Sequence, residues 1–298
     1  MGANLKEVRL RIASVKSTTQ ITKAMKMVSA AKLRRATDRI VQIRPYADQL
    51  NSVLQNIAAN LGGEMNSSFA KQRPVQKVLV VLITSDKGLC GGFNSNSIKL
   101  VKSLLNEKYA NLAAKNKVDI LTVGKKGYDA FKSSKLKINN DFGHLFNSLS
   151  FETTSKAAEY IMYAFEHNEY DAVEVVYGQF KNAGTQVPTV EQFLPIQTPS
   201  TTTTKNTVKG KADYIFEPAQ DQILKDLVPK ILKTQFFRYL LDSNASEHGA
   251  RMTAMDKATE NANELLKSLN IMYNRARQAA ITTELTEIVS GAAALSNG

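Results

Sequence analysis

The sequence predicts an α/β fold combined with a coiled coil: a long antiparallel pair of N- and C-terminal helices with a Rossmann-like α/β domain inserted between them. Two observations predict it. Apolar residues recur every three or four positions at both ends, which is the heptad pattern of a coiled coil. In the middle, short apolar runs alternate with helical stretches, as in a mostly parallel sheet. We therefore divide the 298 residues into an N-terminal helix (1–62), an α/β domain (75–196), a flexible loop (197–213) and a C-terminal helix (214–298).

The N-terminal helix carries an apolar seam in steps of mostly three and four residues. Pro45 lies inside it and is expected to kink or loosen the helix just before itself. Gly62 and Gly63 are expected to end it. The predicted seam consists of Leu5, Val8, Ile12, Val15, Ile21, Met25, Val28, Leu33, Ala36, Ile40, Ile43, Ala47, Leu50, Leu54, Ile57 and Leu61.

The middle of the chain changes to the pattern of strands. Three apolar runs predict strands at 77–84, 118–123 and 172–180, and weaker candidates lie at 136–142 and 185–193. Helical stretches are expected between them, at Ser95–Ala114, Lys125–Ser133 and Thr154–Glu169. This alternation predicts the inserted α/β domain.

The C-terminal region returns to heptads after the polar, low-complexity stretch QTPSTTTTKNTVKGKAD. About 70 helical residues at 1.5 Å each would span roughly 105 Å, far more than a compact domain. We therefore expect the two terminal helices to satisfy each other as an antiparallel pair. The predicted seam consists of Met255, Ala258, Ala262, Leu265, Leu269, Met272, Ala276 and Ala279, then, after a phase shift, Ile281, Leu285, Ile288, Ala292 and Leu295.

A glycine-rich turn, TSDKGLCGGFN, follows the first strand and raises the question of a nucleotide site. A P-loop needs a Lys and a Ser or Thr after its last glycine, and a dinucleotide loop needs G-x-G-x-x-G; the turn has neither. We interpret it as a tight turn with positive φ, in which Asn94 or Ser95 caps the next helix. Asp86, Lys87 and Cys90 have no nearby histidine, and Cys90 is expected to be packed.

The sequence offers no catalytic, cofactor or metal site. Its three histidines, His144, His167 and His248, lack the spacing of metal ligands. The single cysteine suits a reducing compartment. We found no apolar run of membrane-spanning length and no signal peptide, and we interpret the basic start as part of the mature protein.

The charge balance points to an acidic partner. The chain has 39 Lys+Arg against 27 Asp+Glu, a net +12. Residues 1–44 contain eleven basic residues against Glu7 and Asp38. A solvated helix face would also explain this run. A nucleic-acid binder is disfavoured because aromatic residues are not interleaved with the basic ones, and an independent α/β enzyme is disfavoured by the missing phosphate loop.

Four blocks of sequence resemble the γ-subunit family of F-type ATP synthases, in the family's order: ITKAMKMVSAAKLRRA, TSDKGLCGGFN, ARMTAMDKATENA and NRARQAAITTELTEIVSGAAAL. The resemblance implies a central rotor shaft whose coiled coil stands inside a ring of three α and three β subunits. It also implies an α/β domain near the ε subunit and the proton-driven membrane c-ring. ATP would be made or hydrolysed on β, with no catalysis and no cofactor on this chain.

The same resemblance implies roles for particular residues. Lys87 takes the basic position of a D-[RK]-G-L-C-G block that meets an acidic β segment; if Arg is usual there, Lys keeps only a point charge. Arg277, Gln278 and Thr282 should face β loops, and Arg251 should make a polar contact. Part of the basic run should face acidic β segments. Met25 lies on the seam, so a role in filling the core is at least as good an explanation as a coupling role.

The middle domain's length and the absence of a transit peptide favour a bacterial protein. We expect it on the cytoplasmic face of the inner membrane, peripheral through its partners, with the mitochondrial inner membrane as the alternative.

Overall fold

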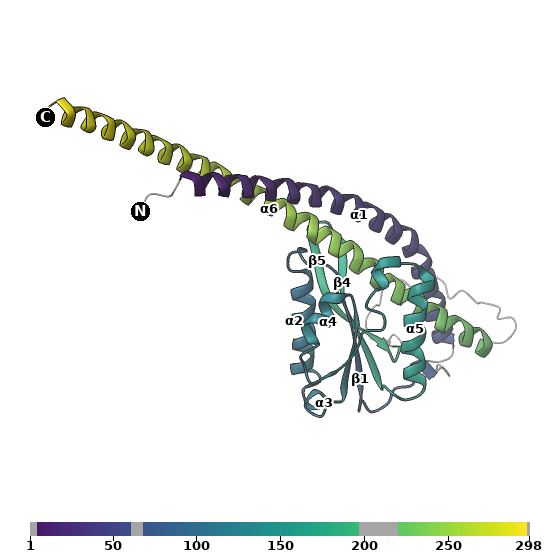
Figure 1. The fold of residues 1–298 in the computed structure, drawn as a ribbon. Coiled ribbons are helices and arrows are strands. Elements are labelled where there is room, and N and C mark those ends of the chain that lie inside the picture. Colours follow the sequence, from purple (N-terminus) through teal and green to yellow (C-terminus); the bar gives the residue numbers. More distant parts are fainter. Residues whose placement is uncertain (1–4, 61–67, 197–219, 297–298) are drawn as a thin grey trace. The chain divides into compact units, whose positions relative to one another are not determined.

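The computed structural model describes residues 5–60, 68–196 and 220–296 (Figure 1). The chain divides into two compact units, one of residues 1–29 with 252–298 and one of residues 30–251. Along the chain the helices, including the short 3₁₀ helices η1 and η2, and the strands are α1 (Leu5–Asn60), η1 (Ser68–Ala70), β1 (Val78–Ile83), α2 (Phe93–Glu107), α3 (Ala110–Ala114), β2 (Val118–Val123), α4 (Lys125–Phe131), β3 (Lys137–Asn139), η2 (Leu145–Ser148), α5 (Phe151–Glu166), β4 (Ala172–Asn182), β5 (Thr185–Leu194) and α6 (Gln220–Ser296).

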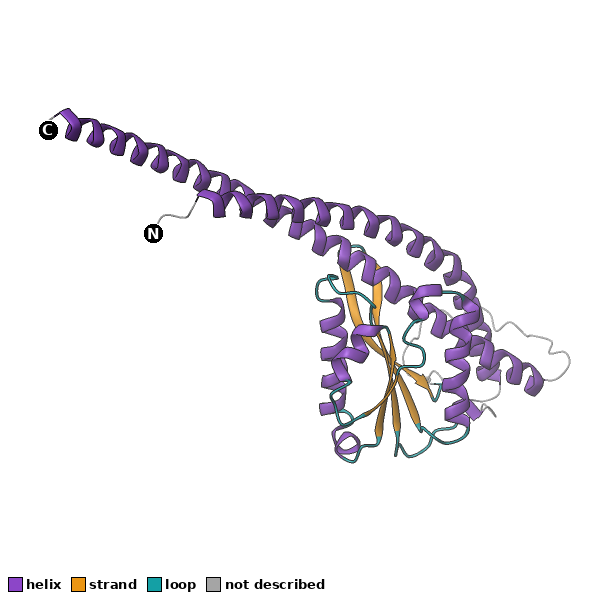
Figure 2. Ribbon diagram, viewed as in Figure 1, coloured by secondary structure: helices purple, strands orange, loops and turns teal. Residues whose placement is uncertain are grey.

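The unit of residues 30–251 contains a five-stranded sheet in the order β3-β2-β1-β4-β5 (Figure 2). Strands β3, β2, β1 and β4 are parallel, and β5 pairs antiparallel with β4 at the edge. All five predicted strands are present, and the expected mostly parallel sheet is confirmed. The helix predicted over 95–114 is interrupted near Tyr109, where α2 ends and α3 begins.

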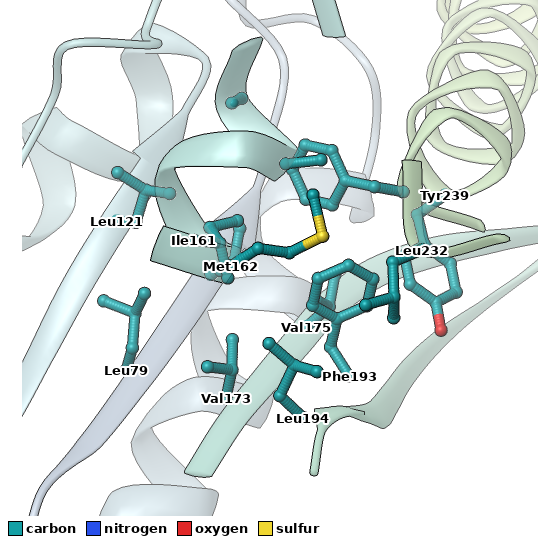
Figure 3. Packing of buried hydrophobic residues seen from close by; sticks show 14 of the residues in the cluster. Leu79, Leu121, Ile161, Met162, Val173, Val175, Phe193, Leu194, Leu232 and Tyr239 are labelled. Atoms are coloured by element: carbon teal, nitrogen blue, oxygen red, sulfur yellow. The ribbon is translucent and has the colours of Figure 1, made fainter. Parts of the chain in front are cut away.

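Two apolar layers cover the sheet. On one face, Leu79, Val173 and Val175 pack with α5 and the beginning of α6, which contributes Leu232 and Tyr239 (Figure 3). On the other face, α2, α3 and α4 pack on a second buried cluster. Strands β1 and β2 are therefore buried at every residue, which explains why β1 is continuously apolar rather than alternating and why β2 is apolar except at Asp119 and Thr122.

Two strands of the sheet each carry a buried carboxylate, Asp119 on β2 and Glu174 on β4, and both are paired. Asp119 accepts a hydrogen bond of 2.9 Å from the Tyr170 hydroxyl and lies 3.1 Å from Lys77 Nζ. Glu174 accepts from the Tyr109 hydroxyl at 2.7 Å and pairs with Lys108. Burial, with the adjacent carboxylate, raises the pKa of both tyrosines. These groups satisfy one another, so we interpret them as structural.

Within the unit of residues 30–251, helix α1 keeps the predicted seam. Leu33, Ala36, Ile40 and Ala47 are all buried, and α1 continues past Pro45. The expected side-chain contacts of Leu54, Ile57 and Leu61, the glycine pair at 62–63 and the loop at 197–213 fall outside what the structure describes.

The unit of residues 1–29 and 252–298 is an antiparallel helix pair. The Thr22 hydroxyl forms a hydrogen bond with the Thr259 hydroxyl. One turn further along α1, Lys26 pairs with Asp256, which lies one turn before Thr259 on α6, so the two helices run in opposite directions. Figure 1 shows α1 and α6 side by side here. The predicted antiparallel coiled coil is therefore confirmed.

The seam predicted for this unit was partly wrong. Ile21 and Val28 are both 57% exposed, whereas Thr22 and Ser29 are buried. The observed α1 seam runs through Val15, Thr19, Thr22, Lys26, Ser29 and Leu33, in unbroken steps of four and three. Apolar residues alone could not show it, because more than half of its positions are polar.

The α6 seam was displaced by one residue for a similar reason. Leu265 is 39% exposed and Met272 is 45% exposed, although both were predicted to be buried. Leu269 is 2% exposed, as predicted. The partly or fully buried positions follow Met255, Thr259, Ala262, Leu266, Leu269, Tyr273 and Ala276. Two neighbouring apolar stripes run along this helix, and the sequence pattern selected the wrong one at several turns.

Candidate functional site

The glycine-rich turn between β1 and α2 is held by hydrogen bonds between its own residues. Asn94 Oδ1 accepts from the Ser85 backbone N–H at 3.0 Å, and Asn94 Nδ2 donates to Ser85 Oγ at 2.7 Å. The prediction that Asn94 or Ser95 caps α2 was wrong: both lie inside the helix, and Gly92 is the N-cap, without a side-chain hydrogen bond. Positive φ occurs at Leu89 (64°) and Gly91 (57°). The predicted left-handed turn is confirmed, but one of its two residues is an exposed leucine.

Arg251 of α6 fastens this turn. Its guanidinium donates to the carbonyl oxygens of Lys87 at 2.9 Å and Gly88 at 3.1 Å, and it forms an ion pair with Glu247. Arg251 and Glu247 are each 8% exposed, and burial raises the pKa of Glu247 while Arg251 opposes the rise. The structure thus brings together two residues singled out in the sequence, Lys87 and Arg251, through the backbone of Lys87 while its side chain stays exposed.

The crevice where an open α/β sheet usually binds its ligand is filled by α6. In this strand order the crevice lies at the carboxyl ends of β1 and β4, where the chain changes direction across the sheet. There Ser246 Oγ donates to Gly178 O at 2.9 Å, and the Gly178 N–H donates to Ser243 Oγ at 3.2 Å. A Cβ on Gly178 would lie 2.5 Å from the Phe93 ring, so only glycine permits this approach.

The turn also has the wrong polarity for a phosphate. A phosphate loop points backbone N–H groups at the ligand. Here two carbonyl oxygens of the turn accept hydrogen bonds from Arg251 instead, and this arginine also pairs with the Glu247 carboxylate, so its guanidinium already has partners. This geometry favours the interpretation of the glycine turn as structural. Cys90 is 2% exposed, which confirms that it is packed.

The basic residues of α1 lie on its exposed surface. Of the eleven between residues 6 and 44, all but Lys26 are exposed. Lys26 is partly buried and pairs with Asp256. Met25, beside it, is also partly buried, and its carbonyl accepts a 2.7 Å bond from Ser29 Oγ. These positions leave both a core role and an interface role open for Met25.

The last part of α6 projects beyond its partner helix. Leu5 lies seventeen residues before Thr22, and Ala276 lies seventeen after Thr259, so these two ends are level in the antiparallel pair. Every residue from 277 to 293 is exposed. The second predicted seam is therefore not packed within the chain: Ile281, Leu285 and Ile288 are 48%, 57% and 68% exposed. We call residues 277–296 the tip.

Arg277, Gln278 and Thr282 all lie at the base of the tip and are exposed. The Thr282 hydroxyl donates to the Gln278 carbonyl at 2.9 Å, a bond within the helix. The tip's apolar side chains recur at steps of four and three, so they form one stripe along the helix. A stripe of this kind is typical of a helix that meets a partner.

Sequence reasoning missed several residues of these sites. Ser85, Ser243, Ser246 and Glu247 are ordinary polar residues in sequence, and only the fold brings them to the crevice. Over the described residues, no group of His, Cys, Asp and Glu could hold a metal, and no helix has the length and apolarity to cross a membrane.

Together these features define a coiled-coil protein with an exposed helical tip and an inserted α/β domain whose ligand crevice is occupied by its own helix. A family model described as ATP synthase matches residues 4–295. The chain is 56% identical to the ATP synthase gamma chain of Cytophaga hutchinsonii over 294 residues, or 99% of each chain. It is 51% identical to that of Flavobacterium psychrophilum over 293 residues, covering 98% of this chain and 99% of the relative.

Solved structures agree with this. A chain of the central stalk and c-ring of Tetrahymena thermophila mitochondrial ATP synthase is 28% identical, with a TM-score of 0.56, covering 80% of this chain and 99% of that one. A chain of the Euglena gracilis mitochondrial ATP synthase shares the fold at 19% identity, with a TM-score of 0.64, covering 98% of this chain and 94% of that one. The chain belongs to the ATP synthase gamma-chain family, and it is a subunit of the central stalk.

Proposed function

We propose that this chain is the rotating shaft that couples proton flow through a membrane c-ring to ATP synthesis or hydrolysis on β subunits, without catalysing either reaction itself. The observation that carries the proposal is the tip. It exposes an apolar stripe on a helix with no partner left in the described chain, which a soluble subunit keeps only where another surface covers it. A surrounding ring of α and β subunits would cover it.

The rest of the molecule supports a mechanical role. The sheet domain is attached to α6 by Ser243, Ser246 and Arg251, with hydrogen bonds of 2.9 to 3.2 Å. Hydrogen bonds of this kind resist sliding between helix and sheet because they are directional. A domain fixed to the shaft in this way could pass torque from the c-ring and the ε subunit into α6.

The candidate contacts with β differ in chemistry. Lys87 offers a point charge on a turn whose backbone is held by Arg251. Arg277, Gln278 and Thr282 flank the apolar stripe of the tip. Exposed ion pairs of roughly 0–1 kcal/mol each suit the basic face of α1, because contacts with acidic β segments must break at every rotary step.

The cellular location of the chain follows from its proposed partners. The similarity to bacterial gamma chains favours the cytoplasmic face of a bacterial inner membrane, where the chain would be peripheral and held by α, β, ε and the c-ring. The mitochondrial inner membrane is the alternative. No nucleic acid is required as a partner. The domain boundaries proposed from sequence (1–62, 75–196, 197–213 and 214–298) serve this arrangement of shaft, inserted domain and connecting loop.

Reconstitution tests the proposal. The chain mixed with α and β subunits should assemble as one copy per three αβ pairs, and a bead attached to the α/β domain should rotate when ATP is added. Alone, the chain should neither hydrolyse Mg-ATP nor bind it in isothermal titration. Micromolar binding at the 84–94 turn, or hydrolysis without β, would contradict the proposed role.

A further inference from the structure

Two threonines face each other across the seam of the antiparallel helix pair formed by residues 5–29 and 252–296. Their Oγ1 atoms lie 2.8 Å apart, and Thr22 is 8% exposed. Thr22 Oγ1 also lies 3.1 Å from the Thr19 carbonyl, and Thr259 Oγ1 lies 2.7 Å from the Met255 carbonyl. Each hydroxyl can donate one hydrogen bond. One threonine therefore donates across the seam to the other, and the second donates to a carbonyl oxygen of its own helix. Both polar groups are thereby satisfied.

Among this register and those one heptad away, a hydroxyl lies opposite Thr22 in this one only. A slip of one heptad would bring Met252 or Leu266 opposite Thr22, and neither carries a hydroxyl. The slip to Leu266 would bring Ser29 opposite Thr259, so Thr22 alone would lose its partner across the seam. Apolar seam positions tolerate such slips better, because one aliphatic side chain replaces another. A buried polar residue at a seam position is known to specify register at some cost in stability. The neighbouring pair of Lys26 and Asp256 is 40% and 45% exposed, so salt screens it, whereas the hydroxyl pair is shielded.

We propose that Thr22 and Thr259 are positioning residues that set the register of α1 against α6. They thereby fix how far the tip projects beyond the start of α1. The register itself does not depend on the proposed function, but its effect on coupling does. In the proposed complex, Arg277, Gln278 and Thr282 can meet β loops at the correct height only if the tip projects by a fixed length. A slip of seven residues would displace the tip along the axis by about 10 Å.

Spin labels on the exposed positions Lys23 and Glu260 measure the register directly in the full chain, with Cys90 changed to Ser so that only these two sites react. The measurement is made in about 1 M salt, where screening acts within about 3 Å and weakens the Lys26–Asp256 pair. The test variant is Thr22→Val with Thr259→Val, which removes both hydroxyls and keeps the side-chain shape. The matched control is Thr18→Val, an exposed threonine one turn earlier on the same helix. Thr22→Ser is the rescue variant, because it keeps the hydroxyl.

We expect one distance population for the parent chain, Thr18→Val and Thr22→Ser. The double valine variant should show a second population from a slip of one or more turns of about 5.4 Å, although its melting temperature is unchanged or raised. A single, unshifted population in the double variant would overturn the proposal. If that variant folds poorly, Thr22→Val alone gives the same readout, since Thr259 can still donate to Met255.

Rotation assays then separate the two claims. In the reconstituted complex, the double variant should complete fewer turns per ATP hydrolysed than Thr18→Val. If the parent chain itself does not rotate, the proposed function fails while the distance measurement still decides the register. If the parent rotates and the double variant shows both one distance population and normal coupling, the register proposal fails alone.

Discussion

Single residues at the crevice hold the inserted domain to its own helix, α6. Arg251 supplies donors to two carbonyl oxygens of the glycine turn, and Glu247 balances its charge in a buried position. A buried ion pair adds little net stability, but removing one partner strands the other charge. We therefore interpret Arg251 as a structural residue that holds the glycine turn, so that its loss would destabilise the turn that carries Lys87 (the fastener role).

Arg251→Ala should lower the free energy of unfolding by about 3 kcal/mol, because it leaves Glu247 buried without its partner and frees two carbonyls. Adding Glu247→Gln should recover part of that loss by removing the stranded charge. Arg275→Ala, an exposed arginine on the same helix, should change stability by no more than about 0.5 kcal/mol. Urea unfolding checks all three, and equal losses for Arg251→Ala and Arg275→Ala would contradict the fastener role.

Asp242 is a second buried group with a measurable consequence. It is 2% exposed, and its Oδ1 has no hydrogen-bond partner in the described structure. Burial raises its pKa from 3.8 to about 6, against the opposing charges of Arg238 and Arg44, and Glu191 adds to the rise. The folded state therefore binds this proton more tightly than the unfolded chain does. Its contribution to stability is fully present below about pH 4 and is lost as the pH rises through about 6.

Asp242→Asn should consequently stabilise the chain at pH 7.5, by up to about 3 kcal/mol for a shift of this size. The gain should shrink between pH 6 and pH 4, where the wild-type carboxyl is already protonated in the folded state. Urea unfolding of both chains at pH 7.5, 6 and 4.5 checks this. A difference that does not vary with pH would mean that Asp242 is ionised in the folded protein across the whole range.

At the scale of the helix, an apolar residue contributes to stability according to whether its stripe is covered by a partner helix. Helix α6 carries two neighbouring apolar stripes, and α1 covers only one of them over residues 252–276. Leu265 and Leu269 are one turn apart on the same helix, yet they are 39% and 2% exposed. The stability of the coiled coil therefore depends on Leu269 much more than on Leu265.

Leu269→Ala should destabilise the helix pair by roughly 2–5 kcal/mol, the usual cost of truncating a buried leucine. Leu265→Ala should cost no more than about half of that loss in the isolated chain, because Leu265 is 39% exposed and its truncation removes less buried apolar surface. Thermal unfolding followed by circular dichroism compares the two. Equal losses would show that the second stripe is also covered.

At the scale of the whole molecule, stability and function are assigned to different residues. The tip contributes no packing within the described chain, so its substitutions should leave the isolated subunit unaffected. Its side chains matter only when partners surround it. An interaction made at one rotary angle and broken at the next shifts the relative energies of those states, which is how binding changes on β could drive rotation.

Replacing both Arg277 and Gln278 by Ala should therefore leave helix content and melting of the isolated chain nearly unchanged, within about 0.5 kcal/mol. The same change should slow ATP turnover or weaken torque in the reconstituted complex. Melting of the chain and single-molecule rotation of the complex are the two measurements. Normal rotation of the double variant would mean that torque passes through other surfaces, such as the basic face of α1.

The sequence by itself determined the class of fold, because periodicity depends on local geometry. Heptads at both ends predicted the paired helices, and buried runs such as 78–83 predicted the strands. The residue types of the glycine turn were also sufficient to argue against a phosphate loop, because no lysine follows Gly88 at the position that would reach a phosphate.

Only the tertiary structure decided which stripe of each helix is covered and what fills the crevice. The seam of α1 passes through Thr22 and Ser29, whose hydroxyls are satisfied by partners that a hydropathy pattern cannot see. Asn94 bonds back to Ser85 rather than capping α2, and Ser243 and Ser246 reach Gly178 from more than sixty residues away. Hydrogen bonds between distant residues depend on where the chain brings them together, and that information is not contained in local spacing.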